Sequence, residues 1–153
     1  MEIKREENIE ITNENIVDID FEDIIAVAYA SGGAMGEPGA VNIYVLVDSR
    51  LQCYHGNHCY GAMRIGGLFS RFPEIKECVK RSTLNGFKRI DMGMGNTLLI
   101  RSEVYASFIH ILEEERVFLY SNYERIILQV CEENEIKSIA KIAKIAKYKN
   151  ELI

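Results

Sequence analysis

The chain has 153 residues, of which 48% are hydrophobic and 27% are charged. These values are typical of a folded globular domain and exclude the low hydrophobicity and high charge of a disordered chain. The net charge of −5 argues against binding to a nucleic-acid duplex, which depends on many lysine and arginine contacts to phosphates. We therefore expect a single folded domain over residues 1–153.

The N-terminal end is strongly acidic. Residues 1–23 contain nine acidic side chains against only Lys4 and Arg5. They hold no apolar run of the kind found in signal peptides, and no part of the chain approaches the roughly 20 apolar residues of a membrane-spanning helix. The sequence therefore predicts a cytoplasmic protein with no membrane span, an acidic segment over residues 1–20, and cysteines that remain free thiols.

Two apolar runs rich in β-branched and aromatic side chains predict buried strands at residues 23–31 and 40–48. The second run is followed by the turn-forming dipeptide DS and by the alternating stretch RLQCYH, so residues 40–55 are predicted to form a hairpin. Side chains alternate across a strand, and one face of this stretch should therefore hold Leu51, Cys53 and His55.

The segment between these strands, SGGAMGEPGA at residues 31–40, is longer and richer in glycine than a hairpin connection requires. Glycines let the backbone approach a ligand closely, and successive amide N–H groups can form a concave site for an anion. The segment is neither a P-loop nor a dinucleotide fingerprint, because it lacks Gly-Lys-Ser/Thr and precedes a strand. We interpret Gly33, Met35 and Gly36 as candidate ligand contacts.

The stretch CYHGNHCYG, residues 53–61, places two cysteines and two histidines in the order C-x-H-x-x-H-C. Such residues can hold zinc, but this spacing matches no standard zinc motif. A cysteine beside a histidine can also act as a nucleophile when a third group orients the imidazole. The third reading is structural, with Cys53 packed as a small hydrophobe and His55 partly buried. The alternative metal or catalytic set is Cys53, His55, His58 and Cys59.

The second half of the chain is predicted to contain a helix, a hairpin and two further helices. Apolar residues at spacings of three and four predict a helix from about Phe72 onwards. Two strands, about 86–91 and 97–101, flank the glycine-bearing turn GMGN. Ser102 is predicted to cap a helix whose inner face holds Val104, Phe108, Ile111 and Leu112, and another helix is expected over residues 122–133.

The C-terminal stretch IKSIAKIAKIAKYK predicts an amphipathic, basic helix over residues 135–150. Its isoleucines and alanines fall on one arc and its lysines on the opposite arc. Docking on the sheet or on the preceding helix is the first interpretation. A second copy of the chain is another possible partner, because its acidic N-terminal segment complements the lysines, and we expect a homo-oligomer, most simply a homodimer.

Together these elements predict an α+β fold with a mainly antiparallel sheet of about four to six strands and three or four helices. If the two glycine-rich turns share one end of the sheet, they border a common site. The candidate ligand-binding residues are Gly33, Met35, Gly36, His55, Asn57, Arg64, Gly93, Gly95, Asn96 and Arg101.

The predicted function is non-catalytic binding of a small anionic ligand, such as a nucleotide or a nucleotide-derived metabolite, with no resident cofactor. Two alternatives stay open. One is a hydrolase or metal-binding protein that uses the cysteine and histidine cluster. The other is a protein-interaction module that uses the two charged ends of the chain.

Overall fold

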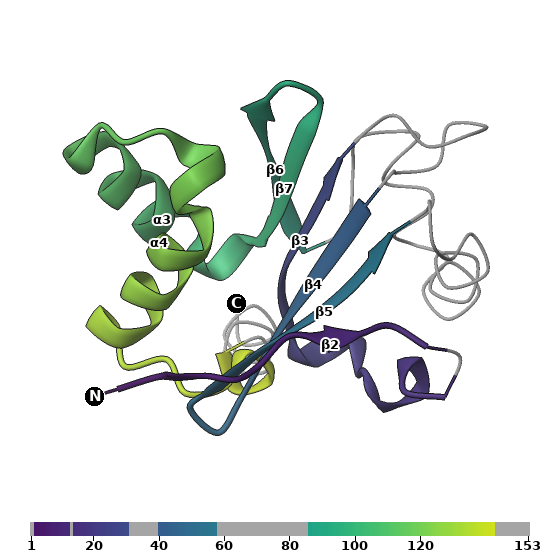
Figure 1. The fold of residues 1–153 in the computed structure, drawn as a ribbon. Helices are drawn as coiled ribbons and strands as arrows, with labels where there is room; N and C mark the ends of the chain where they lie inside the picture. Colours follow the sequence, from purple (N-terminus) through teal and green to yellow (C-terminus); the bar gives the residue numbers. More distant parts are fainter. Residues whose placement is uncertain (1, 13, 31–39, 58–85, 143–153) are drawn as a thin grey trace.

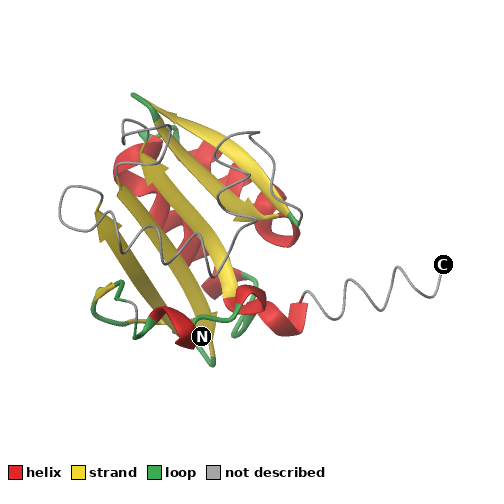
Figure 2. Ribbon diagram, turned by 90° about the vertical axis from the view of Figure 1, so that its right-hand side faces the viewer, coloured by secondary structure: helices red, strands yellow, loops and turns green. Residues whose placement is uncertain are grey.

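The computed structural model describes residues 2–12, 14–30, 40–57 and 86–142. Within them a seven-stranded sheet is covered on one face by two helices, which makes the fold α+β (Figures 1 and 2). The predicted helix from Phe72, most of the glycine-rich segment 31–40, His58, Cys59 and Arg64 lie outside the described residues.

The sheet has the strand order β1-β5-β4-β3-β7-β6, and β2 also pairs with β5. All pairings among β3 to β7 are antiparallel, as predicted, whereas β1 and β2 run parallel to β5. The strands are β1 (Lys4–Arg5), β2 (Ile9–Glu10), β3 (Ile24–Ala30), β4 (Ala40–Val47), β5 (Arg50–Asn57), β6 (Phe87–Gly93) and β7 (Asn96–Arg101). The count exceeds the predicted four to six because β1 and β2 have two residues each, too few to leave a periodic signal in the sequence.

Helices α3 (Ser102–Glu115) and α4 (Leu119–Glu133) pack on the same face of the sheet (Figure 2). Of the apolar positions predicted for the first helix, Val104, Phe108 and Ile111 are buried, and Leu112 is partly buried against the same core. Ser102 is the first helical residue rather than the cap, since the cap position is Arg101 and no side chain bonds to this end. The second helix begins at Leu119 instead of 122, because extended Phe118 already serves as its cap residue.

The other face of the sheet is covered in part by the N-terminal segment. Two short 3-10 helices, η1 (Ile16–Asp18) and η2 (Phe21–Asp23), precede β3. The acidic segment is therefore not merely a charged surface, since its isoleucines pack with the residues of β3 and β4 that point away from the helices. The apolar cluster on this face includes Ile11, Ile16, Ile19, Val27, Tyr29, Ile43 and Leu99.

The C-terminal helix starts later than predicted. Glu135 has a positive φ of 53°, and residues 136–138 are not helical, so the helical run begins at Ile139. Ile136 and Ile139 are buried in the chain's own core while Lys137 and Lys141 are exposed, which agrees with the predicted amphipathic pattern. Ile139 is therefore unavailable to a partner chain. In the described part of the chain, no helix is long and apolar enough to cross a membrane.

The ends of four strands meet on one side of the sheet. Ala30, the last residue of β3, pairs with Ala40 of β4 and with Asn96 of β7, and Ala40 pairs with Asn57 of β5. We call this side the Ala30 end. The turn between β6 and β7 also lies here, and residues 31–39 connect the two strands that meet here, so both glycine-rich turns join the sheet at the same end.

Candidate functional site

Small side chains line the helix-facing side of β3. Ala26, Ala28 and Ala30 alternate with Val27 and Tyr29, and the alanines face α3 and α4 while the larger pair packs on the other face. Near the centre of the sheet the aromatic rings of Tyr44 and Phe108 fill the space between the layers. Towards the Ala30 end a cavity lies above the alanines, bordered by Met92 and by Tyr120 and Tyr123 of α4.

The cavity has a volume of about 250 Å³ and lies between the Ala30 end and the first turns of α4. This volume is slightly below the roughly 300–1,000 Å³ of typical small-molecule sites, so it suits a ligand no larger than one ring system. Alanines and Met92 supply its apolar surface, and polar groups come from both sheet and helix. Its lining residues are Ala28, Tyr29, Ala30, Ala40, Asn42, Met92, Asn96, Tyr120 and Tyr123.

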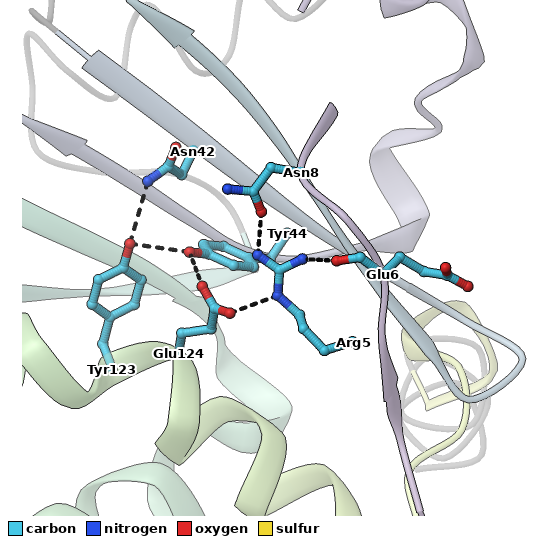
Figure 3. Close-up of polar contacts among 7 residues, drawn as sticks. All are labelled: Arg5, Glu6, Asn8, Asn42, Tyr44, Tyr123 and Glu124. Carbon is cyan, nitrogen blue, oxygen red and sulfur yellow. Dashed lines mark hydrogen bonds and ion pairs between the residues drawn. The ribbon is translucent and has the colours of Figure 1, made fainter. Parts of the chain in front are cut away.

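A chain of hydrogen bonds leads from the cavity into the protein (Figure 3). The Asn42 side-chain amide donates to the Tyr123 hydroxyl at 3.3 Å, and this hydroxyl lies 3.1 Å from that of Tyr44. Tyr44 donates to Oε2 of Glu124 at 2.8 Å. A hydroxyl has one hydrogen to give, so Tyr44 can bond to Tyr123 only as an acceptor. All bonds in this chain therefore point from the cavity towards Glu124.

Arg5 neutralises the far end of this chain. Its Nε donates to Oε1 of Glu124 at 2.5 Å, and its two terminal nitrogens donate to the backbone oxygen of Glu6 and to Oδ1 of Asn8 (Figure 3). Since Arg5 belongs to β1, the N-terminal segment is connected to the cavity lining through Glu124, Tyr44 and Tyr123. We call these five side chains, from Asn42 to Arg5, the polar chain.

Burial keeps the hydroxyl of Tyr44 protonated. The side chain is only 1% exposed, and this burial, together with the neighbouring Cys53 thiol and Tyr123, raises the pKa of Tyr44 far above its ordinary value. Tyr44 is thus a neutral donor throughout the physiological pH range. It supports the position of Tyr123 and does not act as a general base.

The polar groups on the cavity side have already used most of their donors. Tyr123 donates to Tyr44, and one N–H of Asn42 goes to Tyr123. The side-chain nitrogen of Asn96 donates to the backbone oxygens of Gly93 and Met94 at 3.1 and 3.3 Å. The described lining therefore offers a ligand three acceptors, namely the amide oxygens of Asn42 and Asn96 and the second lone pair of Tyr123. It also offers two donors, the second N–H of Asn42 and the hydroxyl of Tyr120.

Several predicted site residues do lie at the Ala30 end. Asn96 lines the cavity, and Gly93, with a φ of 87°, and Gly95, with a φ of 78°, form the adjacent turn. His55 pairs with Asn42 on the neighbouring strand, two positions along β5 from Asn57. It is half-buried and lies one strand away from the cavity lining. Gly33, Met35, Gly36 and Arg64 lie outside the described residues.

Arg101 lies at the opposite end of β7 from Asn96, about 17 Å along the strand at 3.3 Å per residue. Its side chain is 6% exposed and donates to the backbone oxygens of Ile24 at 2.7 Å and Phe21 at 2.6 Å. Its guanidinium lies over the ring of Phe87, 4.3 Å from the centroid, and 5.2 Å from that of Phe21. In this structure Arg101 thus joins the N-terminal segment to the sheet and does not reach the cavity.

Of the cysteine and histidine cluster, the structure describes Cys53 and His55. Cys53 and His55 share the helix-facing side of β5, as predicted, but Cys53 is 2% exposed. Burial raises the pKa of its thiol to about 11, although a hydrogen bond with Tyr44 and the charge of Arg5 act in the other direction. Among the described residues no group of three or more potential ligands is placed to hold a metal ion. The burial and the raised pKa of Cys53 favour its structural reading, whereas His58 and Cys59 lie outside the described residues.

We expect Cys53 and Cys131 to resist alkylation in the native protein at neutral pH. Cys131 is also buried, and burial raises the pKa of its thiol to about 12, so neither residue forms the reactive thiolate to a useful extent. Iodoacetamide labelling followed by peptide mass spectrometry measures this directly. Both cysteines should be labelled only after unfolding in denaturant, and rapid native labelling of Cys53 would revive the nucleophile hypothesis.

Sequence reasoning missed Asn42, Tyr123 and Glu124. Asn42 carried a usable signal, because it is a polar residue within the apolar run AVNIYVLV and its side chain faces the helices, where a polar group requires a partner. Tyr123 and Glu124 carried none, since their role depends on how α4 docks against β4.

Comparison of this chain with protein-family models, with curated proteins and with solved structures gives no significant match.

Proposed function

We propose that this protein binds, without transforming it, a small planar molecule that carries N–H donors, such as the amino-bearing base of a nucleotide-derived metabolite. The observation that carries the proposal is the cavity at the Ala30 end, whose lining combines an alanine surface with the polar side chains of Asn42, Asn96 and Tyr123. Its volume of about 250 Å³ suits one ring system, and the ring of Tyr120 at its border is available for stacking.

The lining of the cavity indicates which part of the expected anionic ligand it would bind. No lysine or arginine belongs to the described lining, so this lining has no charge to offer a phosphate, whereas amide oxygens can pair with an exocyclic amino group. The cavity would therefore hold the uncharged base. The anionic character of the whole ligand rests on the glycine-rich sequences and remains an expectation from them.

Binding without catalysis is the simplest use of these groups. Tyr44 is a neutral hydrogen-bond donor committed to Glu124, and Glu124 is paired with Arg5. These side chains hold Tyr123 in place and do not present a free acid or base to the cavity. The rigid backing favours recognition because the acceptors are oriented before the ligand arrives.

A thermal-shift screen tests the proposal with matched pairs of compounds. Adenine, adenosine and AMP should stabilise the protein, and hypoxanthine, inosine and IMP, which lack the amino group, should do so less. At 100 times its dissociation constant a ligand stabilises the native state by about 2.7 kcal/mol, equivalent to a shift of several degrees in Tm for a domain of this size. The guanine and cytosine compounds extend the same comparison.

Two variants show whether any shift arises at the cavity. Ala30→Leu should fill the space and abolish the shift, and Asn42→Leu should weaken binding by about tenfold through the loss of one hydrogen-bonding group. Ala106→Leu is the matched control, because Ala106 is exposed on α3 and the substitution adds the same atoms. If no amino-bearing base stabilises the wild type, or if Ala30→Leu responds like Ala106→Leu, the proposal is wrong.

A further inference from the structure

The two edges of the sheet differ in how they are covered. On one side β5 is paired with β1 and β2 of the N-terminal segment. On the other side β6, seven residues long, forms the edge, and within the described ranges no strand pairs with its outer side. An unpaired edge of this length presents backbone N–H and C=O groups to which another strand can add.

The ladder between β6 and β7 fixes which residues present these groups. Ser102 donates its backbone N–H to the oxygen of Gly86 at 2.9 Å, and the next pair along the ladder is Phe87 with Arg101. Bonded and non-bonded pairs alternate in an antiparallel ladder. Lys88 and Ile90 therefore bond to β7, whereas the outward-directed backbone groups belong to Phe87, Arg89 and Asp91.

The charges of Arg89 and Asp91 favour the pairing of β6 with a second β6 strand in one particular alignment. Arg89 and Asp91 are both exposed and share the face away from the helices. If a second β6 pairs antiparallel about a two-fold axis at Ile90, each Arg89 lies opposite an Asp91, and outward-directed residues meet outward-directed residues. A two-fold axis at Arg89 would oppose two arginines, and one at Lys88 would oppose two lysines, which is unfavourable.

We propose that two copies of this chain form a homodimer through β6, with Ile90 on the two-fold axis and the two sheets joined into one. The occupant is a second copy because the order Arg89, Ile90, Asp91 is self-complementary about its centre. An isologous two-fold contact of this kind closes on itself and adds no further copies. The interface differs from the charged termini considered from the sequence, since Ile139 is buried within its own chain.

Charge reversal and charge exchange test the alignment. Sedimentation velocity of the full chain over micromolar to submillimolar concentrations should show a dimer. Arg89→Glu places two like-charged pairs across the axis and should weaken dimerisation by about tenfold or more. The double variant with Arg89→Asp and Asp91→Arg exchanges the charges and should restore the dimer, a recovery that loss of folding could not produce.

A proline substitution tests the backbone pairing separately. The N–H of Arg89 points outwards, so Arg89→Pro removes a donor from the edge without removing a bond to β7, and edge strands tolerate proline at such positions. This variant should be monomeric, and circular dichroism should show an unchanged secondary structure. A wild type that stays monomeric at submillimolar concentration would overturn the proposal, as would a dimer that Arg89→Pro leaves intact.

Discussion

Replacing Arg101 by alanine should lower the free energy of unfolding by about 3–4 kcal/mol, the combined effect of two charged hydrogen bonds and two ring contacts. Burial lowers the pKa of Arg101, with the carboxylates of Glu103, Glu22 and Asp23 acting in the opposite direction, but a guanidinium stays protonated at neutral pH. The buried oxygen of Ile24 would lose its charged donor. Urea denaturation monitored by circular dichroism measures the loss.

Two further variants separate the causes of this loss. Arg101→Lys keeps the charge but cannot span the oxygens of Ile24 and Phe21 while stacking on Phe87, so it should recover about half of the lost stability. Arg50→Ala is the matched control, because the Arg50 side chain is 67% exposed and makes only a 3.7 Å ion pair with Glu6. It should cost less than about 1 kcal/mol. Equal losses for Arg101→Ala and Arg50→Ala would contradict this account.

A second large effect is expected at Tyr44, the centre of the polar chain. Tyr44→Ala should cost about 4 kcal/mol, as expected for an aromatic side chain removed from a core. Tyr44→Phe keeps the ring and should cost about 1–2 kcal/mol, because Glu124 and Tyr123 both lose a hydrogen-bond partner. The free energies of unfolding from urea titrations give both values.

The matched control for the hydroxyl is Tyr120→Phe. Tyr120 is 50% exposed, and solvent replaces any bond that its hydroxyl makes, so the stability should hardly change. If Tyr44→Phe were as mild as Tyr120→Phe, the polar chain would not contribute to folding. The difference between Tyr44→Ala and Tyr44→Phe then reports the packing of the ring alone.

The sequence predicted the elements whose signal is local. The strands from β3 to β7 and the helix α3 follow from hydrophobic period and turn residues, and Asp48 and Ser49 form the β4–β5 turn with φ values of 50° and 64°. Such left-handed positions usually hold asparagine or glycine. The alternation of apolar residues on both flanks was enough to place the turn without that signal.

The sequence failed where structure depends on distant partners. β1 and β2 exist because Lys4 and Ile9 pair with β5 residues more than 40 positions later, and two-residue strands have no period to detect. The sequence places Arg101 in the same candidate site as Asn96, because the two residues are close in sequence. Five residues of extended chain separate them by the length of β7, and the hydrogen-bond acceptors of Arg101 are the backbone oxygens of Phe21 and Ile24.

The candidate site was predicted in outline only. From the sequence, a common site required both glycine-rich turns to lie at one end of the sheet. The strands that flank the two turns do meet at the Ala30 end. The cavity itself arises from alanines of β3 meeting the start of α4, and no pattern within either element describes that meeting. Side chains from the two layers, such as Asn42 and Tyr123, become neighbours only through helix docking.

The hydrogen bonds of the β4–β5 turn affect how the molecule unfolds. Its two amides do not face solvent, because Asp48 donates to the hydroxyl of Ser138 at 2.8 Å and Ser49 donates to the backbone oxygen of Lys137 at 2.8 Å. Ser49 in turn accepts a bond from Lys4. A hairpin tip is usually among the first places to fray. Here the turn joins the N-terminal strand, the central hairpin and the C-terminal segment, so we expect these three parts to unfold together.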